Sequence, residues 1–521
     1  MIPTLSQIRK AQGSRQDPST MISRKKQRTT CEQSKLARSG AFAGVRILAF
    51  AVVFAMGTIA AVAQSGESEN PSYGTTGSAT LSSGSQSVYS GSVPEGHATG
   101  TVLPISFKEA IDRALRNNLG LLIGSDNLLA AKGQRWQELS HLLPNISAAA
   151  TQSATQIDLA ALGFRFRFPG VAPVVGPLGT FDARAYLTAP VFDWHAIQRE
   201  RAAQARESAA QHDYKNAREL VVLATGNVYL LTIAAGARVD AAQAQLETAQ
   251  ALFNKAKDQQ AAGVTPAIDA LRAQVEYQAR QQELIVARNN YAKEKLQLAR
   301  TIGLPPGQEF NLTDKAPYEP LAPLGLEEAL RRAYRDRPDY LSAVQQVLSA
   351  ERLRSAATAE HLPTLGINGN YGAAGINIGN SHGVFLAGLT LEIPIFAGGR
   401  SHADALQAEA ALRQSRQQLD NMRAQIDYEI RTALLDLNAA SDQVQVAKSS
   451  LDLANQTLEQ ARDRFTAGVA DNLEVVQAQE TVAAANENYI ASLYAHNVAK
   501  VSLARAIGFA EQGVRLYLEG K

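Results

Sequence analysis

The chain has 521 residues, of which 19% are charged and only 6% are aromatic, and its formal net charge is +2. That value averages two different regions, because residues 1–63 carry ten Lys and Arg against two acidic residues. The chain after residue 63 has 41 basic and 47 acidic residues and is therefore acidic. This charge argues against a nucleic-acid partner.

The N-terminal 63 residues have the pattern of an export signal. A basic region precedes the apolar run AFAGVRILAFAVVFAMGTIAAVA, which ends in a small-x-small pattern and predicts cleavage before Gln64. A retained membrane anchor, interrupted by Arg46, is the alternative. Met21 is a second candidate for the initiating residue. Cys31, the only cysteine, precedes the predicted cut and lacks a lipid-attachment context, so no disulfide or thiolate metal site is expected in the mature chain.

The next segment, residues 64–100, is rich in Ser and Gly and has little that could be buried. We expect it to be a flexible leader.

The remainder of the chain is duplicated. FKEAIDRALRNN at 107–118 matches LEEALRRAYRDR at 326–337 with an offset of 219. APVFDW at 189–194 matches IPIFAG at 393–398 with an offset of 204, and AGV at 262–264 matches AGV at 467–469 with an offset of 205. These matches predict a first repeat at 101–304, a linker at 305–323, a second repeat at 324–509 and a C-terminal tail at 510–521.

Each repeat is predicted to contain a short helix, a second helix, two strands, a very long helix, a tip and a last helix. The long helices, at 195–260 and 401–466, would each be about 100 Å long. The helices at 121–142 and 267–301 are shorter and are expected to flank the first long helix end to end. The tips are predicted at 262–266 and 467–471.

The second long helix carries a heptad seam. Apolar residues recur there at alternating spacings of three and four, which predicts a left-handed coiled-coil contact. The seam comprises Ile430, Ala433, Leu437, Ala440, Val444, Ala447, Leu451, Ala454, Leu458, Ala461 and Phe465.

Four segments alternate between apolar and polar residues, at about 145–157, 181–191, 364–372 and 384–395. Segments of about ten residues with this alternation are typical of outer-membrane barrel strands, although each taken alone also fits a half-buried hairpin of a soluble domain. About eight strands are the practical minimum for a barrel, and lipid does not tolerate an open sheet edge. Membrane strands would therefore require several copies of the chain to share one wall, and the product would be a channel.

Taken together, these features resemble the TolC family of outer-membrane efflux channels, over about residues 103–509. The resemblance rests on the duplicated strand entries at Pro144 and Pro363, the joint PIFAGGRSHADALQAEA at 394–410, the AGV tips and the closing LARAIG at 503–508. It implies an α+β membrane protein with a long coiled-coil helical barrel and a transmembrane β-barrel completed by trimerisation. It also implies a location in the outer membrane, extending into the periplasm, and no cofactor.

The same resemblance implies partners and site residues. A periplasmic adaptor protein would join the channel to an inner-membrane pump of the RND, ABC or a similar class, and the cargo is left open among drugs, metals and proteins. The family's tip turns bind the adaptor, which carries over to Gly263, Val264, Gly468 and Val469. Each glycine also fits the end of a helix in the left-handed conformation, and this role is compatible with adaptor contact.

A pore constriction is expected just after the tips, where the resemblance places acidic side chains. It carries over to Glu474, to Gln477 where a second acid is common, and to the equivalent Asp269. The alternative is that Glu474 only caps its helix together with Asp471. In the first repeat, Thr265 is predicted to cap the helix that holds Asp269.

No catalytic or metal-binding residues are predicted. GNSHG at 379–383 has the form of a nucleophile motif, but that chemistry needs a strand-to-helix turn and this segment lies between two predicted strands. The alternative function is a soluble periplasmic coiled-coil adaptor or scaffold, although such proteins commonly carry one helical hairpin and not two.

Overall fold

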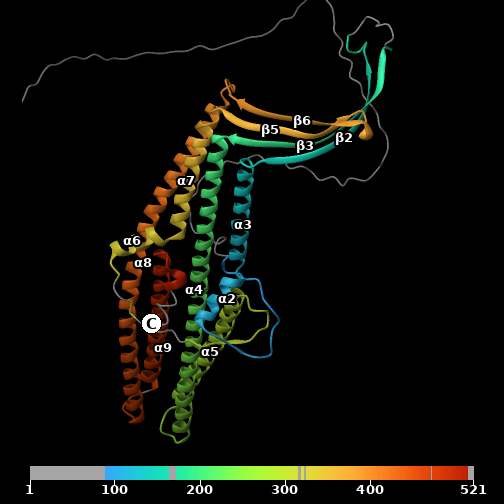
Figure 1. Cartoon of the computed structure of the whole chain (residues 1–521). Helices are drawn as coiled ribbons and strands as arrows, with labels where there is room; N and C mark the ends of the chain where they lie inside the picture. The colour runs from blue at the N-terminus through green and yellow to red at the C-terminus, as the bar shows by residue number, and fades with distance from the viewer. Residues whose placement is uncertain are drawn as a thin grey trace, which may run out of the picture. The chain divides into compact units, whose positions relative to one another are not determined.

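The computed structural model of the protein describes residues 89–163, 172–314, 318, 320–321, 324–470 and 472–513. The predicted signal at 1–63, the leader as far as residue 88 and Asp471 lie outside the described residues. The two repeats are drawn in Figure 1, each preceded by a three-residue strand. These strands, β1 (Leu103–Ile105) and β4 (Phe310–Leu312), pair in parallel.

The predicted order of elements is confirmed in both repeats. The first repeat comprises α2 (Phe107–Asn117), α3 (Leu119–Ser140), β2 (Asn145–Asp158), β3 (Val174–Phe192), α4 (Trp194–Ala261) and α5 (Ala267–Ile302). The second comprises α6 (Leu326–Asp336), α7 (Pro338–Thr358), β5 (Thr364–Gly375), the 3-10 turn η1 (Ile378–Asn380), β6 (Ser381–Glu392), α8 (Arg400–Thr466) and α9 (Asn472–Ala506).

The two long helices begin and end within one residue of their predicted bounds. Asp193 precedes α4 and its Oδ1 accepts a hydrogen bond from Ala196 N at 2.9 Å, which satisfies one of the free N–H groups of the first turn. On α8, nine of the eleven predicted seam positions are buried, and Ala447 and Leu451 are half-buried. This seam packs mainly against α9, as expected for a coiled-coil contact.

Shorter helices cover both long ones. α3 and α5 flank α4 as predicted, while α7 packs against both α4 and α8, and α9 against both α8 and α4. In Figure 1 the strands β2, β3, β5 and β6 lie at one end of α4 and α8, and the tips lie at the other end. Where α2, α4 and α5 meet, Tyr229 is fully buried with its ring 5.2 Å from that of Phe107.

The four longer strands form one antiparallel sheet in the order β2-β3-β5-β6. β3 begins seven residues before its predicted start because it continues to pair with β2 beyond the point where β5 ends. Gly176, Pro177 and Gly179 in this extension have low strand propensity and mask the strand pattern in the sequence.

One prediction near the start of the chain needs correction, and the first residues after the second repeat also contact the helices. Residues 89–100 belong to the predicted flexible leader, yet residues 92, 93 and 95 donate backbone hydrogen bonds to carbonyls of α5, its capping glycine and α2. Residues 510–513 belong to the predicted tail, yet Ala510 is fully buried and its N–H donates to Glu219 Oε2 at 2.6 Å. Both segments hold polar backbone groups that find partners on the helices, which composition does not reveal.

Candidate functional site

The sheet has one apolar and one polar face, as the alternation in the sequence predicts. Residues that share a face by strand pairing include Ile146, Leu187, Ile367, Tyr371, Phe385, Leu389 and Leu391, all with exposed fractions above one third. The opposite face carries an ion pair between Arg184 and Asp182 and a hydrogen bond from Arg184 to Asn370. One face is thus suited to hydrocarbon and the other to water.

The sheet is open at both sides within the described residues. β2 pairs with β3 alone and β6 pairs with β5 alone, so each presents a row of unpaired N–H and C=O groups. Ile393, Ile395 and Phe396 follow β6 and are strongly exposed, Ile395 to 95%. An open, apolar sheet edge of this kind needs a further strand before it can lie in lipid.

The helical layer below the sheet has open sides of the same kind. Toward the tips, α4 packs against α5 and α9, and α9 packs against α8, so α5 and α8 lie at the two sides of the layer. Both carry exposed apolar residues: Ile268, Leu271, Val275, Ile285, Val286 and Leu296 on α5, and Tyr428, Leu435, Val446 and Leu453 on α8.

Membrane contact by a helix has weaker support. Of the described helices, only α4 has a stretch long and apolar enough to cross a membrane, with mean hydropathy 1.8, and half of that stretch is buried inside the fold.

The two tips have the same backbone geometry. Gly263 and Gly468 both have φ of +72°, the left-handed conformation that glycine adopts without strain. Val264 N donates to Gln259 O at 2.9 Å in the first tip, and Val469 N donates to Arg464 O at 3.0 Å in the second. These are the bonds of a Schellman motif, so each glycine ends its helix.

Both predicted adaptor-contact valines point into solvent. Val264 is 71% exposed and Val469 is 72% exposed, and both glycines are exposed as well. Nothing else in the chain covers the tips, as far as the described residues extend. The tips therefore present apolar side chains at the ends of α4 and α8 that lie opposite the sheet (Figure 1).

Two of the predicted constriction residues, Asp269 and Glu474, lie on the first turns of the helices that follow the tips. Glu474, on α9, accepts a hydrogen bond from Arg464 Nη1 at 2.9 Å, so its carboxylate is paired with the end of α8. Asp269, on α5, lies 3.8 Å from Arg272 Nη1. Gln477 is exposed one turn after Glu474.

Helix capping at the first tip differs from the prediction. Pro266 and not Thr265 is the N-cap of α5, and it makes no side-chain capping bond. The Thr265 hydroxyl is buried without a hydrogen-bond partner. Pro266 has a φ of −64°, which a helix would accept, but its ψ of 151° is extended, so the helix starts one residue later than the capping rule suggests. Asp471, predicted to cap α9, lies outside the described residues.

A contact between the two tips is not evident in the sequence. Lys255 Nζ, near the end of α4, donates to Thr466 Oγ1 at 2.6 Å and lies 5.7 Å from the centre of the Phe465 ring. A cleft of about 570 Å³ lies between these helices and is lined by Glu247, Leu252, Arg462 and these three residues, among others. Lys255 therefore ties the end of one long helix to the end of the other.

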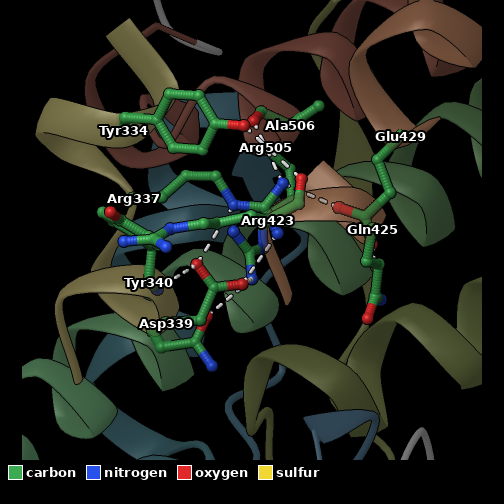
Figure 2. Close-up of polar contacts among 10 residues, drawn as sticks. Tyr334, Arg337, Asp339, Tyr340, Arg423, Gln425, Glu429, Arg505 and Ala506 are labelled. Atoms are coloured by element: carbon green, nitrogen blue, oxygen red, sulfur yellow. Dashed lines mark hydrogen bonds and ion pairs between the residues drawn. The ribbon is translucent and has the colours of Figure 1, made fainter. Parts of the chain in front are cut away.

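A buried ion cluster lies at the joint between α6 and α7 (Figure 2). Arg337 donates to both carboxylate oxygens of Asp339, at 3.1 and 2.7 Å, to Glu429 Oε2 at 2.7 Å, and to the carbonyl of Ala506 at 3.2 Å. Burial alone would raise the pKa of Asp339, but the hydrogen bond from Arg337 and the charges of Arg505 and Arg337 lower it to about 2. The sequence contains no spacing signal for this cluster.

Known proteins resemble the chain along both repeats. The alkaline protease secretion protein AprF of Pseudomonas aeruginosa is 22% identical over 57% of this chain, and the match spans 63% of AprF, less than two thirds of its length. The outer membrane protein OprJ of the same organism is 26% identical over 78% of this chain and 85% of OprJ.

A solved structure shares the fold. The crystal structure of the CmeC outer membrane channel of Campylobacter jejuni matches 78% of this chain and 86% of CmeC, with a TM-score of 0.65 and 18% identity.

The family model described as outer membrane efflux protein matches residues 110–304 and 329–509, one span in each repeat. This match confirms the resemblance found in the sequence and does not favour the alternative of a soluble adaptor. The family consists of transport channels and not of enzymes. The chain belongs to the outer membrane efflux protein family.

Proposed function

We propose that three copies of this chain form one channel that conducts substrates passively through the outer membrane. An adaptor in the periplasm would connect the channel to an inner-membrane pump of the RND, ABC or a similar class, and the pump would supply the energy. The observation that carries this proposal is the four-stranded sheet, which has one apolar face and two unpaired edges. Three such sheets, joined edge to edge, would give twelve strands and no edge in lipid.

The internal duplication supports a specific pairing between copies. Asn145 pairs with Thr188 in the first hairpin, and Thr364 pairs with Glu392 in the second. The offset of 219 relates β2 to β5 and the offset of 204 relates β3 to β6, so the two hairpins have the same strand register. β3 pairs with β5 within the chain. Because β6 corresponds to β3 and β2 corresponds to β5, the equivalent contact would join β6 of one copy to β2 of the next. Tyr186 pairs with Asn370 within the chain, so Thr390 would pair with Thr151 of the neighbouring copy.

The helical layer supports the same assembly. If β6 of one copy adjoins β2 of the next, α8 of that copy would adjoin α3 and α5 of the next, because α3 leads into β2 and α8 follows β6. The exposed apolar residues of α8 and α5 would then cover one another. At about 25 cal/mol per Å² of apolar surface, burial of several such side chains at each of three contacts is a substantial driving force for assembly.

The tips are the proposed adaptor contact. Gly263 and Gly468 end their helices sharply, and Val264 and Val469 present apolar side chains to solvent. Apolar residues surrounded by polar ones are typical of a protein contact. The constriction is proposed at Glu474, Gln477 and Asp269, where three copies would bring acidic side chains together around one axis.

Membrane fractionation tests the channel. We expect the protein in the outer-membrane fraction, as an assembly that dissociates only on heating in detergent. Release of all the protein by osmotic shock would contradict a membrane channel.

Adaptor binding is tested with two matched variants. The adaptor that co-purifies with the unaltered chain is first identified by mass spectrometry. Val469→Asp should lower recovery of that adaptor, because it places a charge in the proposed apolar contact, whereas Val102→Asp, at a position that is 49% exposed and lies before β1, should not. Equal recovery of the adaptor with both variants would show that the second tip does not contact the adaptor.

A further inference from the structure

We infer that the first repeat contains a groove that binds an extended peptide, and that residues 89–95 of the chain, here termed the strap, occupy it. The second repeat closes the equivalent groove with the Arg337 cluster. This inference concerns the fold of each copy and does not depend on the proposed function.

On one side of the groove the strap binds the end of α5. Ser92 N donates to Arg300 O at 3.1 Å, and Glu95 N donates to Gly303 O at 3.2 Å. Ser92 Oγ also donates to the carbonyl of Thr301. The last carbonyls of a helix have no partner within the helix, so the strap supplies the donors that they lack.

On the other side the strap binds the joint between α2 and α3. Val93 N donates to Asn117 O at 2.8 Å, and Leu119 N donates to Gly91 O at 3.1 Å. Leu119 is the first residue of α3, where backbone N–H groups also lack a partner within the helix. The strap therefore satisfies the ends of two helices, α5 and α2, with its donors and the start of α3 with an acceptor, as an added β-strand satisfies a sheet edge.

Two side-chain features fit the groove to the strap. Asn118 Nδ2 donates to Tyr89 O at 2.6 Å, while its Oδ1 accepts from Gly120 N at 2.9 Å. The Tyr89 ring lies over Gly120 so closely that a Cβ at Gly120 would be 2.5 Å from Tyr89 Cδ1. A side chain at position 120 and the Tyr89 ring in its present position exclude each other, so the first residue of the strap would have to shift.

The second repeat lacks each feature that receives the strap. By the offset of 219, Asn118, Leu119 and Gly120 correspond to Arg337, Pro338 and Asp339. Pro338 has no N–H to donate to a strap. Asp339 has a carboxylate at the position where glycine admits the Tyr89 ring.

In the second repeat the Arg337 side chain supplies the hydrogen-bond donor that the strap supplies in the first. By the offset of 205, Thr301 corresponds to Ala506, and the Ala506 carbonyl accepts from Arg337 Nη1 at 3.2 Å (Figure 2). Asp339 then holds the guanidinium through two of its nitrogens. The same pair of helix ends is thus satisfied by a peptide in one repeat and by a side-chain cluster in the other. An unsatisfied buried carbonyl is costly, so both grooves must be filled.

Gly120→Ala tests the strap, because helix propensity and displacement of the strap predict opposite effects for this variant. Alanine has a higher helix propensity than glycine. If no strap were bound beside Gly120, α3 would therefore become more stable in this variant. We expect instead that amide hydrogen exchange in residues 89–95 and at Leu119 becomes faster, on the order of tenfold, while residues 335–341 exchange as before. Gly133→Ala, in the same helix with open space at its Cβ, is the control and should change neither region. Unchanged exchange in Gly120→Ala would overturn the inference.

A peptide-binding measurement tests the groove separately. Ser92→Pro removes the Ser92 N–H and hydroxyl and should release the strap. A fluorescent synthetic peptide of residues 89–97 should then bind the purified variant saturably and should not bind the unaltered chain. Failure to bind the variant, once exchange shows that its strap is released, would contradict a peptide groove.

Discussion

Arg464 Nη1 lies 2.9 Å from Glu474 Oε1, so an ion pair joins the last turn of α8 to the first turn of α9 across the second tip. The pair is exposed and contributes no more than about 1 kcal/mol to stability. Its larger consequence is electrostatic, because each proposed constriction carboxylate has a cation beside it.

Glu474→Gln should shift the ion selectivity of the channel toward anions, since it leaves the charge of Arg464 without a partner. Reversal potentials in planar bilayers under a salt gradient measure this shift. Arg464→Gln combined with Glu474→Gln should restore most of the original selectivity. Glu480→Gln, further along α9, is the control and should have little effect. An unchanged reversal potential in Glu474→Gln would assign this residue to the tip structure alone.

Gly468→Ala should destabilise the second tip by about 1–2 kcal/mol, because φ of +72° is unfavourable for a residue with a Cβ. The space around Gly468 is open, so a steric clash makes no contribution. Hydrogen exchange at residues 464–470 measures the effect. An equal response at the tip to Gly133→Ala, which lies within α3, would show that the backbone conformation of Gly468 is not the cause.

His496 should make the protein less stable as the pH falls from about 6.5 to 4. Its side chain is buried beside Tyr318, and burial, followed by the charge of Lys500, lowers its pKa to about 4. The imidazole takes up a proton near pH 6.5 in the unfolded chain but only near pH 4 in the folded chain. The contribution of the neutral His496 to stability is therefore fully present above pH 6.5 and is lost as the pH falls toward 4. Within the window, the free energy of unfolding should fall by about 1.4 kcal/mol per pH unit and per copy.

Urea unfolding at a series of pH values checks this expectation. His496→Gln should flatten the pH dependence in that window, and His402→Gln, which alters an exposed histidine, should leave it unchanged. The same slope in His496→Gln and in the unaltered protein would show that other groups take up the proton.

Much of the fold could be predicted because its signals are local and occur twice. The heptad seam from Ile430 to Phe465 places an apolar residue at every turn of α8. The two strand faces follow from alternation within each strand. The tips recur as AGV, where glycine is required by the left-handed backbone.

The remaining features depend on contacts between distant parts of the chain. Ser92 binds Thr301, 209 residues away, and Arg337 binds Ala506, 169 residues away. Neither residue stands out in its own neighbourhood, because one lies in a Ser-rich segment and the other in a charged helix end. The contact of Lys255 with Thr466 is of the same kind. Only the fold brings these residues together.

Cross-linking between copies tests the shared wall most directly. The mature chain is expected to contain no cysteine, so Thr390→Cys and Thr151→Cys in one chain would supply the only thiols. Mild oxidation in membranes should convert this variant into covalent assemblies of up to three copies. Thr390→Cys with Gln152→Cys is the control, because the two thiols would then lie on opposite faces of the sheet. Only monomers after oxidation of the Thr390 and Thr151 pair, or equal cross-linking in the control, would contradict a barrel built from several chains.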